Sequence, residues 1–552
     1  MMKINKNLFV SRLLAVLTAF LVCLSLTARA NVFNVTNLFD SGAGSLRDAI
    51  TQAESSAGSD TINFGVGGTI NFGSILPTIT SDISISSNGF GVTFDGTSAG
   101  DRAFLQTGGT LSLSGLTIQN FTATNVTTSS TSGGAIRVEG GDLNISGSTF
   151  IGNSGLTGGA IRLQGGGTGT INSSTFTGNS SLQGGAITTS SANLNLIGSQ
   201  VTNNTSINTG NLATGIGGGL SLSGGVVSID NSDISDNVGE RAGGGLRING
   251  ATVTITNSSI NSNEAQTLDE DGGGLIVFGE ADVTISDSEI NENTSNGSAG
   301  GLQMQNVDTE VTLERTTVDG NEARTGGGIA IDGGELTITQ TTISNNEATD
   351  TTGGGIQGVR ATDITIENST ISGNTSSGGG GGIALGEEVS GEITSSTIAF
   401  NNSGGGGAGL RFSQGADNTF EVENSIFSDN LNSGTPDNIS GPVESLGYNL
   451  FDDDGGGIVA SIGDQFNAFA DLDALAANGG PTFTHALGVF SEAIDAGSTN
   501  LPTDQRGFFR PGGSADDIGA YEFGAVPELS ATSLFVGIAA LLVVTRRRRR
   551  YR

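Results

Sequence analysis

Aliphatic residues alternate with Thr, Ser or Asn over many short stretches of the chain. Clear examples are VTITNSSI at 253–260, LTITQTTI at 336–343 and DITIENSTI at 363–371. A period of two places every second side chain on the same face of a strand, so each stretch predicts a short β-strand with one buried face. Since one such repeat cannot bury its apolar face alone, the stretches are expected to stack on one another.

Two landmarks divide these stretches into repeats. A step rich in Gly and Ala ends on Ile or Leu at Ile136, Ile161, Ile187, Leu220, Leu246, Leu275, Leu302, Ile329, Ile356, Ile383 and Leu410. An Asn with an aliphatic residue or Phe three positions earlier follows 17 to 20 residues later. These residues are Asn153, Asn179, Asn204, Asn237, Asn263, Asn293, Asn321, Asn346, Asn374, Asn401 and Asn430.

This spacing predicts an all-β solenoid. The best solution is a right-handed parallel β-helix with one coil per repeat of 25–33 residues and capped ends. The glycines supply backbone conformations that other residues resist. The recurring Asn tolerates left-handed turns and can bond its counterpart in the next coil, which predicts a ladder.

The repeat over residues 131–430 resembles the polymorphic outer membrane protein repeat of bacterial surface proteins. The motif GGAI at 133–136 and 158–161, followed by FIGN and FTGN, matches that repeat residue by residue, and later copies change to GGGL or GGGI. The resemblance implies a β-helix exposed at a cell surface, and some members of the family serve as adhesins.

The flanks of the repeat region differ from it. In residues 31–130, GSLRDAITQAE predicts a helix beginning after Ser45 that caps the rod, ahead of the first coils, and this region resembles the leader of secreted bacterial β-helices. Residues 431–525 are expected to form the last coils and a cap. There NGGPTFTHALGVFSEAIDAG, TDQRGFFR and DIGAYEFG resemble the choice-of-anchor Q domain, which implies an anchoring context. The charged residues of this cap are expected to pair with one another: Asp504, Arg506, Arg510, Asp517 and Glu522.

Both ends of the chain have the composition of targeting segments. Residues 1–30 have basic residues, an apolar run and a small-residue cleavage site after Ala30, which predict a secretory signal peptide. Residues 526–552 combine a short motif containing Pro527 and Glu528 with an apolar stretch and an arginine run. This tail resembles the PEP-CTERM sorting signal of Gram-negative bacteria, except for Leu529 where that family usually has Pro. The resemblance implies processing by an exosortase-type enzyme, and a plain single-span anchor is the alternative.

The charge of the chain excludes several classes of partner. The formal net charge is −33, and no Lys occurs between residues 31 and 525. Such a body repels nucleic acid and anionic membranes, so contact with a membrane is expected only through the transmembrane tail. The single cysteine, Cys23, lies in the signal peptide, which leaves the mature body without disulfides or thiol chemistry.

No catalytic or cofactor-binding residue is assigned. His485 is the only histidine and lies in the terminal region, which excludes a Ser-His-Asp site and a His/Cys zinc site on the rod. Two carboxylates remain compatible with acid–base catalysis. A lyase would use an Arg beside acidic residues, for which Arg241, Arg247 and Arg324 are candidates. The rod also offers few aromatic residues as sugar platforms.

Two longer connections predict a ligand-binding edge. The interval from the Asn to the next aliphatic landmark grows after Asn204 and Asn263, in the segments 205–216 and 264–271. Insertions on one edge of a solenoid often form the binding face. The candidates there are Glu240, Glu264 and Glu270. The Ca²⁺ candidates are Glu322, Glu347, Asp269 and Asp271, and the alternative is that they are solvated surface acids.

Together these features predict an exported protein of the cell surface or extracellular matrix of a Gram-negative bacterium. Its expected role is adhesion or structure within an extracellular polysaccharide matrix. The alternative is a polysaccharide lyase or glycoside hydrolase on the same scaffold. An Arg flanked by carboxylates in one long groove would favour the enzyme, whereas a smooth face of Thr, Ser and Asn would favour the structural role.

Overall fold

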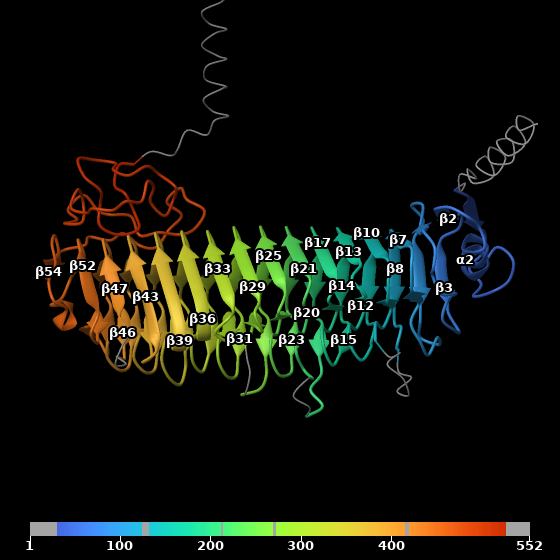
Figure 1. Cartoon of the computed structure of the whole chain (residues 1–552), viewed down its shortest axis with the longest axis horizontal. Coiled ribbons are helices and arrows are strands. Elements are labelled where there is room, and N and C mark those ends of the chain that lie inside the picture. Colours follow the sequence, from blue (N-terminus) through green and yellow to red (C-terminus); the bar gives the residue numbers. More distant parts are fainter. Residues whose placement is uncertain (1–29, 124–131, 211–213, 269–271, 414–418, 526–552) are drawn as a thin grey trace, which may run out of the picture.

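The chain forms a rod of stacked coils (Figure 1). The computed structural model describes residues 30–123, 132–210, 214–268, 272–413 and 419–525. The fold is an all-β right-handed parallel β-helix of about 15 turns, so the predicted fold class is confirmed. No helix among the residues described is long and apolar enough to cross a membrane. The expected tail, with Pro527 and Glu528, lies outside them, as does the expected signal peptide up to residue 29.

Each full coil contributes to four parallel ladders, here called faces 1 to 4 in chain order. Face 1 begins at the aliphatic landmark, and every one of the eleven predicted landmarks is the first residue of its strand. The strands of face 1 are β6 (Phe104–Gln106), β9 (Ile136–Val138), β12 (Ile161–Gln164), β16 (Ile187–Ser190), β20 (Leu220–Ser223), β24 (Leu246–Asn249), β28 (Leu275–Phe278), β32 (Leu302–Gln305), β36 (Ile329–Thr339), β39 (Ile356–Glu367), β42 (Ile383–Leu385), β46 (Leu410–Phe412) and β51 (Ile439–Ser440).

Face 2 carries the alternating stretches. Strands β36 and β39 run through the corner between faces 1 and 2, which joins the two ladders into one 27-stranded sheet. The other strands of face 2 are β1 (Val32–Val35), β2 (Asp60–Phe64), β4 (Ile83–Ser86), β7 (Thr110–Ser114), β10 (Asp142–Ser146), β13 (Thr168–Asn172), β17 (Asn193–Ile197), β21 (Val226–Asp230), β25 (Thr252–Thr256), β29 (Asp282–Ser286), β33 (Glu310–Glu314), β43 (Val389–Thr394), β47 (Phe420–Glu423) and β52 (Glu444–Gly447).

Face 3 is a 16-stranded sheet that precedes the recurring Asn. Its strands are β3 (Gly68–Asn71), β5 (Val92–Asp95), β8 (Leu116–Gln119), β11 (Thr149–Ile151), β14 (Thr175–Thr177), β18 (Gln200–Thr202), β22 (Asp233–Ser235), β26 (Ser259–Asn261), β30 (Glu289–Asn291), β34 (Thr317–Asp319), β37 (Thr342–Ser344), β40 (Thr370–Ser372), β44 (Thr397–Ala399), β48 (Ile426–Ser428), β53 (Leu450–Phe451) and β54 (Gln465–Phe466).

Face 4 follows the Asn and consists of two-residue strands in an 11-stranded sheet. They are β15 (Ser180–Ser181), β19 (Thr205–Ser206), β23 (Val238–Gly239), β27 (Glu264–Ala265), β31 (Thr294–Ser295), β35 (Glu322–Ala323), β38 (Glu347–Ala348), β41 (Thr375–Ser376), β45 (Asn402–Ser403), β49 (Leu431–Asn432) and β50 (Thr435–Pro436), the last of them antiparallel.

The predicted Asn ladder is present at the corner between faces 3 and 4. All eleven Asn side chains are buried. From Asn153 to Asn401, each Nδ2 donates to the Oδ1 of the Asn in the next coil at 2.9–3.0 Å. The same Nδ2 also donates to a carbonyl of the preceding coil, as Asn204 does to Phe176 at 3.0 Å. The ladder thus satisfies backbone groups that the turn leaves without a strand partner.

A second polar ladder, which the sequence analysis missed, lies at the corner between faces 2 and 3. A buried Ser or Thr stands five residues before each Asn. Its hydroxyl accepts from the backbone N–H of its counterpart in the preceding coil, as from Ser148 to Ser174 at 3.2 Å, and donates to the carbonyl two residues earlier. These residues are Ser148, Ser174, Ser199, Ser232, Ser258, Ser288, Thr316, Thr341, Ser369, Ser396 and Ser425.

The Gly-Gly step is required by the backbone conformation and by the close approach of the next coil. Gly133 has φ +70°, in the left-handed region, and a Cβ on Gly134 would lie 2.0 Å from the carbonyl oxygen of Gly159 in the next coil. A side chain at Gly134 would therefore collide with backbone that cannot move away.

The N-terminal helix forms where the sequence predicts it. α2 (Leu46–Glu54) begins after Ser45, whose Oγ accepts from the N–H of Asp48 at 3.2 Å. Its buried face, made of Leu46, Ala49, Ile50 and Ala53, packs against the first coil. The helix covers the N-terminal end of the rod in Figure 1.

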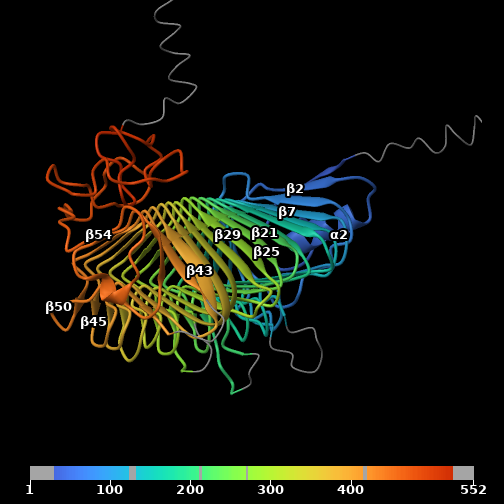
Figure 2. The ribbon, with the colours of Figure 1, turned by 60° about the vertical axis from the view of Figure 1, so that its left-hand side comes forward.

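The C-terminal part of the chain lies along the side of the rod. After β54, residues 468–525, here called the C-terminal segment, form irregular loops beside the C-terminal half of the coils (Figure 2). They bury Leu487 and Ile518 against Ile426 of face 3. A cap was predicted over the end of the rod, and the segment instead packs on face 3.

The Asn ladder yields a prediction for stability. In the variant Asn204→Ala, the carbonyl of Phe176 and the side chain of Asn179 lose buried partners. Groups left in this way cost about 1–3 kcal/mol each, so we expect the free energy of unfolding to fall by about 3 kcal/mol or more. Urea denaturation followed by circular dichroism measures the change.

The control is Asn195→Ala, on the outward side of β17 in the same coil. We expect this variant to stay within about 0.5 kcal/mol of the parent. Equal losses for the two variants would contradict a structural role for the ladder.

Candidate functional site

Face 3 has two halves with different exposure. In β14, β18, β22, β26, β30 and β34, only the central residue is buried, so the outward side chains are accessible. In β37, β40, β44 and β48 all three residues are buried, because the C-terminal segment covers them. The open half of face 3 therefore runs into a wall made by the C-terminal segment.

A shallow groove follows the open half of face 3. Its first part has a volume of about 480 Å³ and follows the corner between faces 2 and 3 through four coils, from Gly198 to Glu289. The floor consists mainly of Ser, Asn, Gln and acidic side chains, at equivalent positions of successive coils. Such a surface offers regularly spaced hydrogen-bond donors and acceptors.

The second part of the groove begins at Glu289, which lines both parts, and ends against the C-terminal segment. Its volume is about 680 Å³. The floor is polar, from Asn291 and Asp319 to Ser372, whereas the end is apolar, made by Phe400 and residues 474–485. This combination of an apolar wall and convergent polar groups is typical of small-molecule sites.

Phe400 is in an unusual conformation. It has φ +58° at the corner before Asn401, a position that Gly, Asn, Asp or Ser occupies in most other coils. A bulky side chain in the left-handed region is strained, and such residues cluster at functional sites. The ring is 40% exposed and its centroid lies 5.0 Å from that of His485.

The wall that carries Phe483 is fixed to the rod by hydrogen bonds. Thr482 Oγ1 donates to the carbonyl of Gln340 at 2.9 Å, and the Phe483 carbonyl accepts from Thr342 Oγ1 at 2.6 Å and from Gln505 Nε2 at 3.1 Å. The Phe483 side chain itself is 50% exposed. The wall is thus held in place while its aromatic ring faces solvent.

His485 supports this wall and stays neutral. Its Nδ1 lies 2.7 Å from the carbonyl of Asp473 and its Nε2 lies 2.8 Å from Ser372 Oγ. Because a carbonyl only accepts, Nδ1 carries the proton and Nε2 accepts from the hydroxyl. Burial lowers the pKa of His485, so the floor of the pocket carries no positive charge from it at neutral pH.

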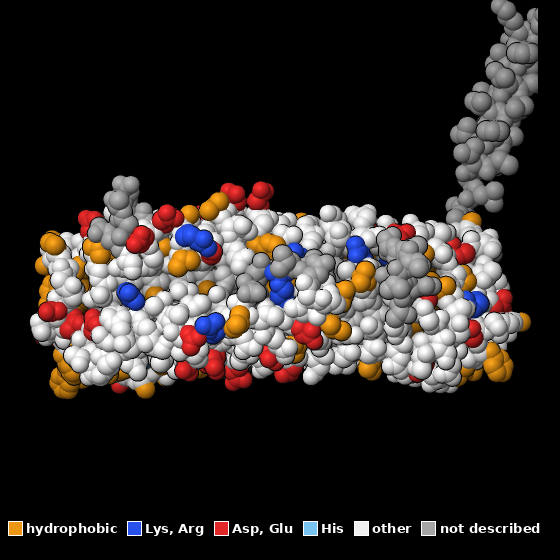
Figure 3. Space-filling view, turned by 90° about the horizontal axis from the view of Figure 1, so that it is seen from below, with side chains coloured by type: hydrophobic (Ala, Val, Ile, Leu, Met, Phe, Trp, Pro, Cys, Tyr) orange, Lys and Arg blue, Asp and Glu red, His pale blue; other side chains and the backbone are white. Residues whose placement is uncertain are grey.

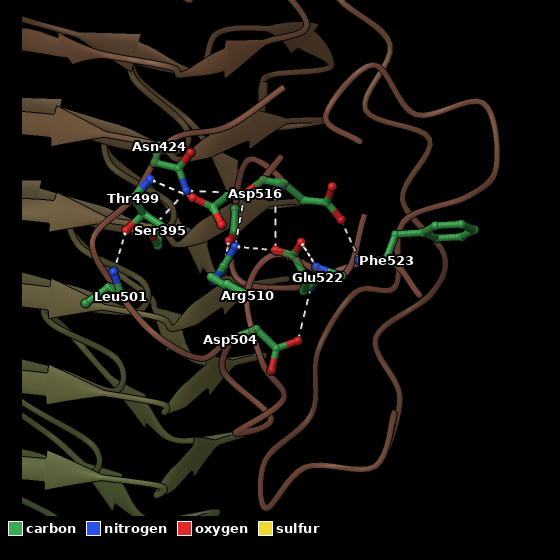
Figure 4. Close-up of polar contacts among 12 residues, drawn as sticks. Ser395, Asn424, Thr499, Leu501, Asp504, Arg510, Asp516, Glu522 and Phe523 are labelled. Carbon is green, nitrogen blue, oxygen red and sulfur yellow. Dashed lines mark hydrogen bonds and ion pairs between the residues drawn. The ribbon is translucent and has the colours of Figure 1, made fainter. Parts of the chain in front are cut away.

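Four of the five charged residues that were predicted to pair within residues 504–522 form ion pairs. The carboxylate of Asp517 instead accepts from the backbone N–H groups of Asp495 and Phe523. Arg510 and Glu522 form a fully buried pair at 2.9 Å (Figure 4). Arg506 pairs with Asp504 at 2.6 Å. Arg510 also donates to the carbonyls of Asp517 and Gly519. Burial lowers the pKa of Arg510 and raises that of Glu522. The pairs hold the C-terminal segment together and do not reach the groove.

Two of the four predicted calcium candidates lie among the described residues. Glu322 and Glu347 are register neighbours on face 4, as the sequence indicated, and both are exposed. Asp269 and Asp271 lie outside the described residues, as does Glu270. Among the described residues no group of three or more metal-ligating side chains is present.

The other ligand-face candidates lie on the edge at face 4. Glu240 accepts from the N–H of Asn208, in the longer connection, at 2.8 Å, and Glu264 accepts from Gln266 at 3.2 Å.

Figure 3 views the underside of the rod, where acidic and basic side chains are spread among uncharged ones. The residues of the groove were missed by the sequence analysis, although Phe400 breaks the corner pattern visible in the sequence.

The Arg residues considered for a lyase do not line the groove. Arg324 pairs with Asp350 at 2.6 Å beside face 4, Arg247 lies over the ring of Phe278 on face 1, and Arg241 is buried. Arg315 lies beside the groove, because it binds Asp287 of the groove lining. It donates two hydrogen bonds of 2.7 Å to Asp287, which raise the pKa of Arg315. A guanidinium held in this way is a poor general base.

A protein-family model agrees with the fold. The profile of the family described as "Right handed beta helix region" matches residues 209–371 and 300–461. The crystal structure of pectate lyase Pel9A is similar with 12% sequence identity and a TM-score of 0.30, over 90% of this chain and 97% of that chain. No curated protein sequence gives a significant match.

The lowered pKa of His485 predicts a pH dependence. The unfolded chain, with a His pKa of about 6.5, binds the proton more tightly than the folded chain. The contribution of neutral His485 to stability is therefore present above pH 6.5 and is lost as the pH falls below it. The raised pKa values of Asp517 and Glu522 act in the opposite direction, since their folded forms take up protons more readily.

Comparison with the variant His485→Gln separates the two effects. Urea denaturation at about pH 7 and about pH 5 should show that the parent loses more stability, relative to this variant, at the lower pH. An identical pH dependence for the two proteins would contradict the assignment of a neutral, buried His485.

Proposed function

We propose that this chain is an exported protein of the cell surface or extracellular matrix, which binds polysaccharide and serves adhesion or matrix structure. The observation that carries the proposal is the groove on face 3. Its floor advances by about 4.8 Å with each coil, and successive coils present polar side chains of differing type, such as Gln200, Asp233, Ser259 and Glu289. An extended polymer can thus make polar contacts with several coils in succession.

The export part of the proposal rests on the sequence. It combines the signal peptide ending at Ala30, the repeat that resembles bacterial surface proteins, and the PEP-CTERM-like tail with Pro527 and Glu528. On this proposal, the tail is processed by an exosortase-type enzyme in a Gram-negative host. The rod then remains outside the membrane, where extracellular polysaccharide is its available partner.

The charge of the groove specifies the kind of polysaccharide. Asp233, Asp287, Glu289 and Asp319 line it, and the adjacent Arg315 is already neutralised by Asp287. Uronate polymers would be repelled by these carboxylates unless cations intervened. The groove is therefore suited to a neutral polysaccharide.

Binding without cleavage fits the groove better than a lyase. The Arg beside the groove has a raised pKa, and both nitrogens of His485 are engaged in hydrogen bonds. Among the described residues, neither side chain is available as a base for abstracting a sugar proton.

The test measures binding and cleavage together. The purified protein is mixed with the extracellular polysaccharide of its host, with a neutral glucan and with polygalacturonate, in the presence of Ca²⁺. We expect co-sedimentation with a neutral polymer at unchanged polymer length. A fall in polymer length would contradict the binding role, and the absence of sedimentation with all polymers would contradict polysaccharide binding itself.

A matched pair of variants locates the binding face. Ser259→Arg places a long side chain in the groove, whereas Thr254→Arg places the same side chain outward on face 2 of the same coil. We expect about tenfold weaker binding for Ser259→Arg, the equivalent of about 1.4 kcal/mol, and unchanged binding for Thr254→Arg. Equal binding by the two variants would contradict the assignment to face 3.

A further inference from the structure

We infer that the end of the groove beneath the C-terminal segment is a subsite for one or two neutral sugar rings, bound by stacking between Phe400 and Phe483. This inference rests on the proposed function and deepens it, because it assigns the affinity to one pocket. The pocket of about 680 Å³ is large enough for a short saccharide and too small for a folded partner.

The two rings provide the apolar contact. Phe400 and Phe483 are 40% and 50% exposed, and both line the same pocket from different parts of the chain. An aromatic ring left in water at such a place costs free energy that a bound apolar surface recovers. A sugar ring presents one face of C–H groups that can pack on Phe, while its hydroxyl groups remain at the edge.

The floor provides partners for those hydroxyl groups. Asp319 Oδ1 accepts from Ser344 Oγ at 2.6 Å and from Asn345 Nδ2 at 2.7 Å, while Oδ2 receives no hydrogen bond from the described residues. Glu289 accepts from Asn291 through Oε2 at 3.3 Å, and its Oε1 is likewise open within the described part of the chain. Two carboxylate oxygens are thus free to accept from hydroxyl groups.

The pocket is preorganised. The hydrogen bonds of Thr482, Thr342 and Gln505 fix the backbone at Phe483, and His485 is held by Ser372 and Asp473. The strained backbone at Phe400 places its ring against His485. A site built in advance loses little conformational entropy on binding.

The position of the pocket indicates which part of a bound polysaccharide would occupy it. The C-terminal segment buries the strands of face 3 from β37 to β48, so the open surface of face 3 ends at this pocket. A polysaccharide chain lying in the groove would therefore place its terminal rings in this pocket. The inferred ligand is the end of a neutral glycan chain, or a free oligosaccharide of the same chemistry.

The test uses short saccharides on the full-length protein. Tetrasaccharides of glucose, mannose and galactose are titrated calorimetrically, with tetrasaccharides of glucosamine and of galacturonate as charged counterparts. We expect saturable binding of a neutral tetrasaccharide. Tighter binding of a charged tetrasaccharide would overturn the assignment of a neutral ligand.

Three variants separate binding from folding. Phe400→Asn removes the ring and places at the left-handed corner a residue type that occupies it at Asn203 and Asn345. We expect about tenfold weaker binding with an unchanged or higher melting temperature. Phe483→Ala should weaken binding to a similar extent. Phe490→Ala, which removes an exposed ring outside the pocket, should bind like the parent.

The outcomes distinguish the subsite from the proposed function. Suppose that the parent co-sediments with a neutral polymer. If all variants then bind tetrasaccharides equally, or if the parent binds none, the subsite is overturned and the wider proposal stands. Failure to bind polymer and tetrasaccharides alike would overturn both.

Discussion

The buried row of Asn side chains is the constraint on which the rest of the rod depends. Every coil must bring its Asn to the same place, because each Nδ2 bridges the Asn of the next coil and a carbonyl of the preceding one. The Ser/Thr ladder on the neighbouring corner adds the same requirement five residues earlier. With both corners and the aliphatic interior fixed, only outward side chains and connections can vary without disturbing the stack.

The C-terminal segment breaks the uniformity of the rod. It covers four strands of face 3 and leaves the strands from β14 to β34 accessible. The surface of an otherwise regular sheet therefore has a step where the covered strands begin. The buried pair of Arg510 and Glu522 holds the segment together, and the contacts of Gln505 with Thr370 and Thr342 hold it against the coils. At its edge, polar groups and Phe400 of the coils meet Phe483 of the segment, so the pocket forms only where the two parts of the chain come together.

The sequence was sufficient to predict the coils, because the strand periodicity and the Asn are local patterns that recur in every repeat. The helix after Ser45 was equally readable from its cap. The groove was not predicted, because it depends on how residues 468–525 return to strands more than a hundred positions earlier. The sequence instead favoured Glu240 and Glu264, since longer connections are visible in a sequence and a wall between distant segments is not. Phe400 was the available clue, as an aromatic residue at a left-handed corner.

The most direct test of this account is hydrogen exchange of the backbone amides, followed by mass spectrometry, with and without a neutral oligosaccharide that binds. The account predicts added protection in the open strands of face 3 from β30 to β34, around Phe400, and in residues 474–485, with no change in the connections 205–210 and 264–268. Protection confined to those connections would contradict it and return the binding site to face 4.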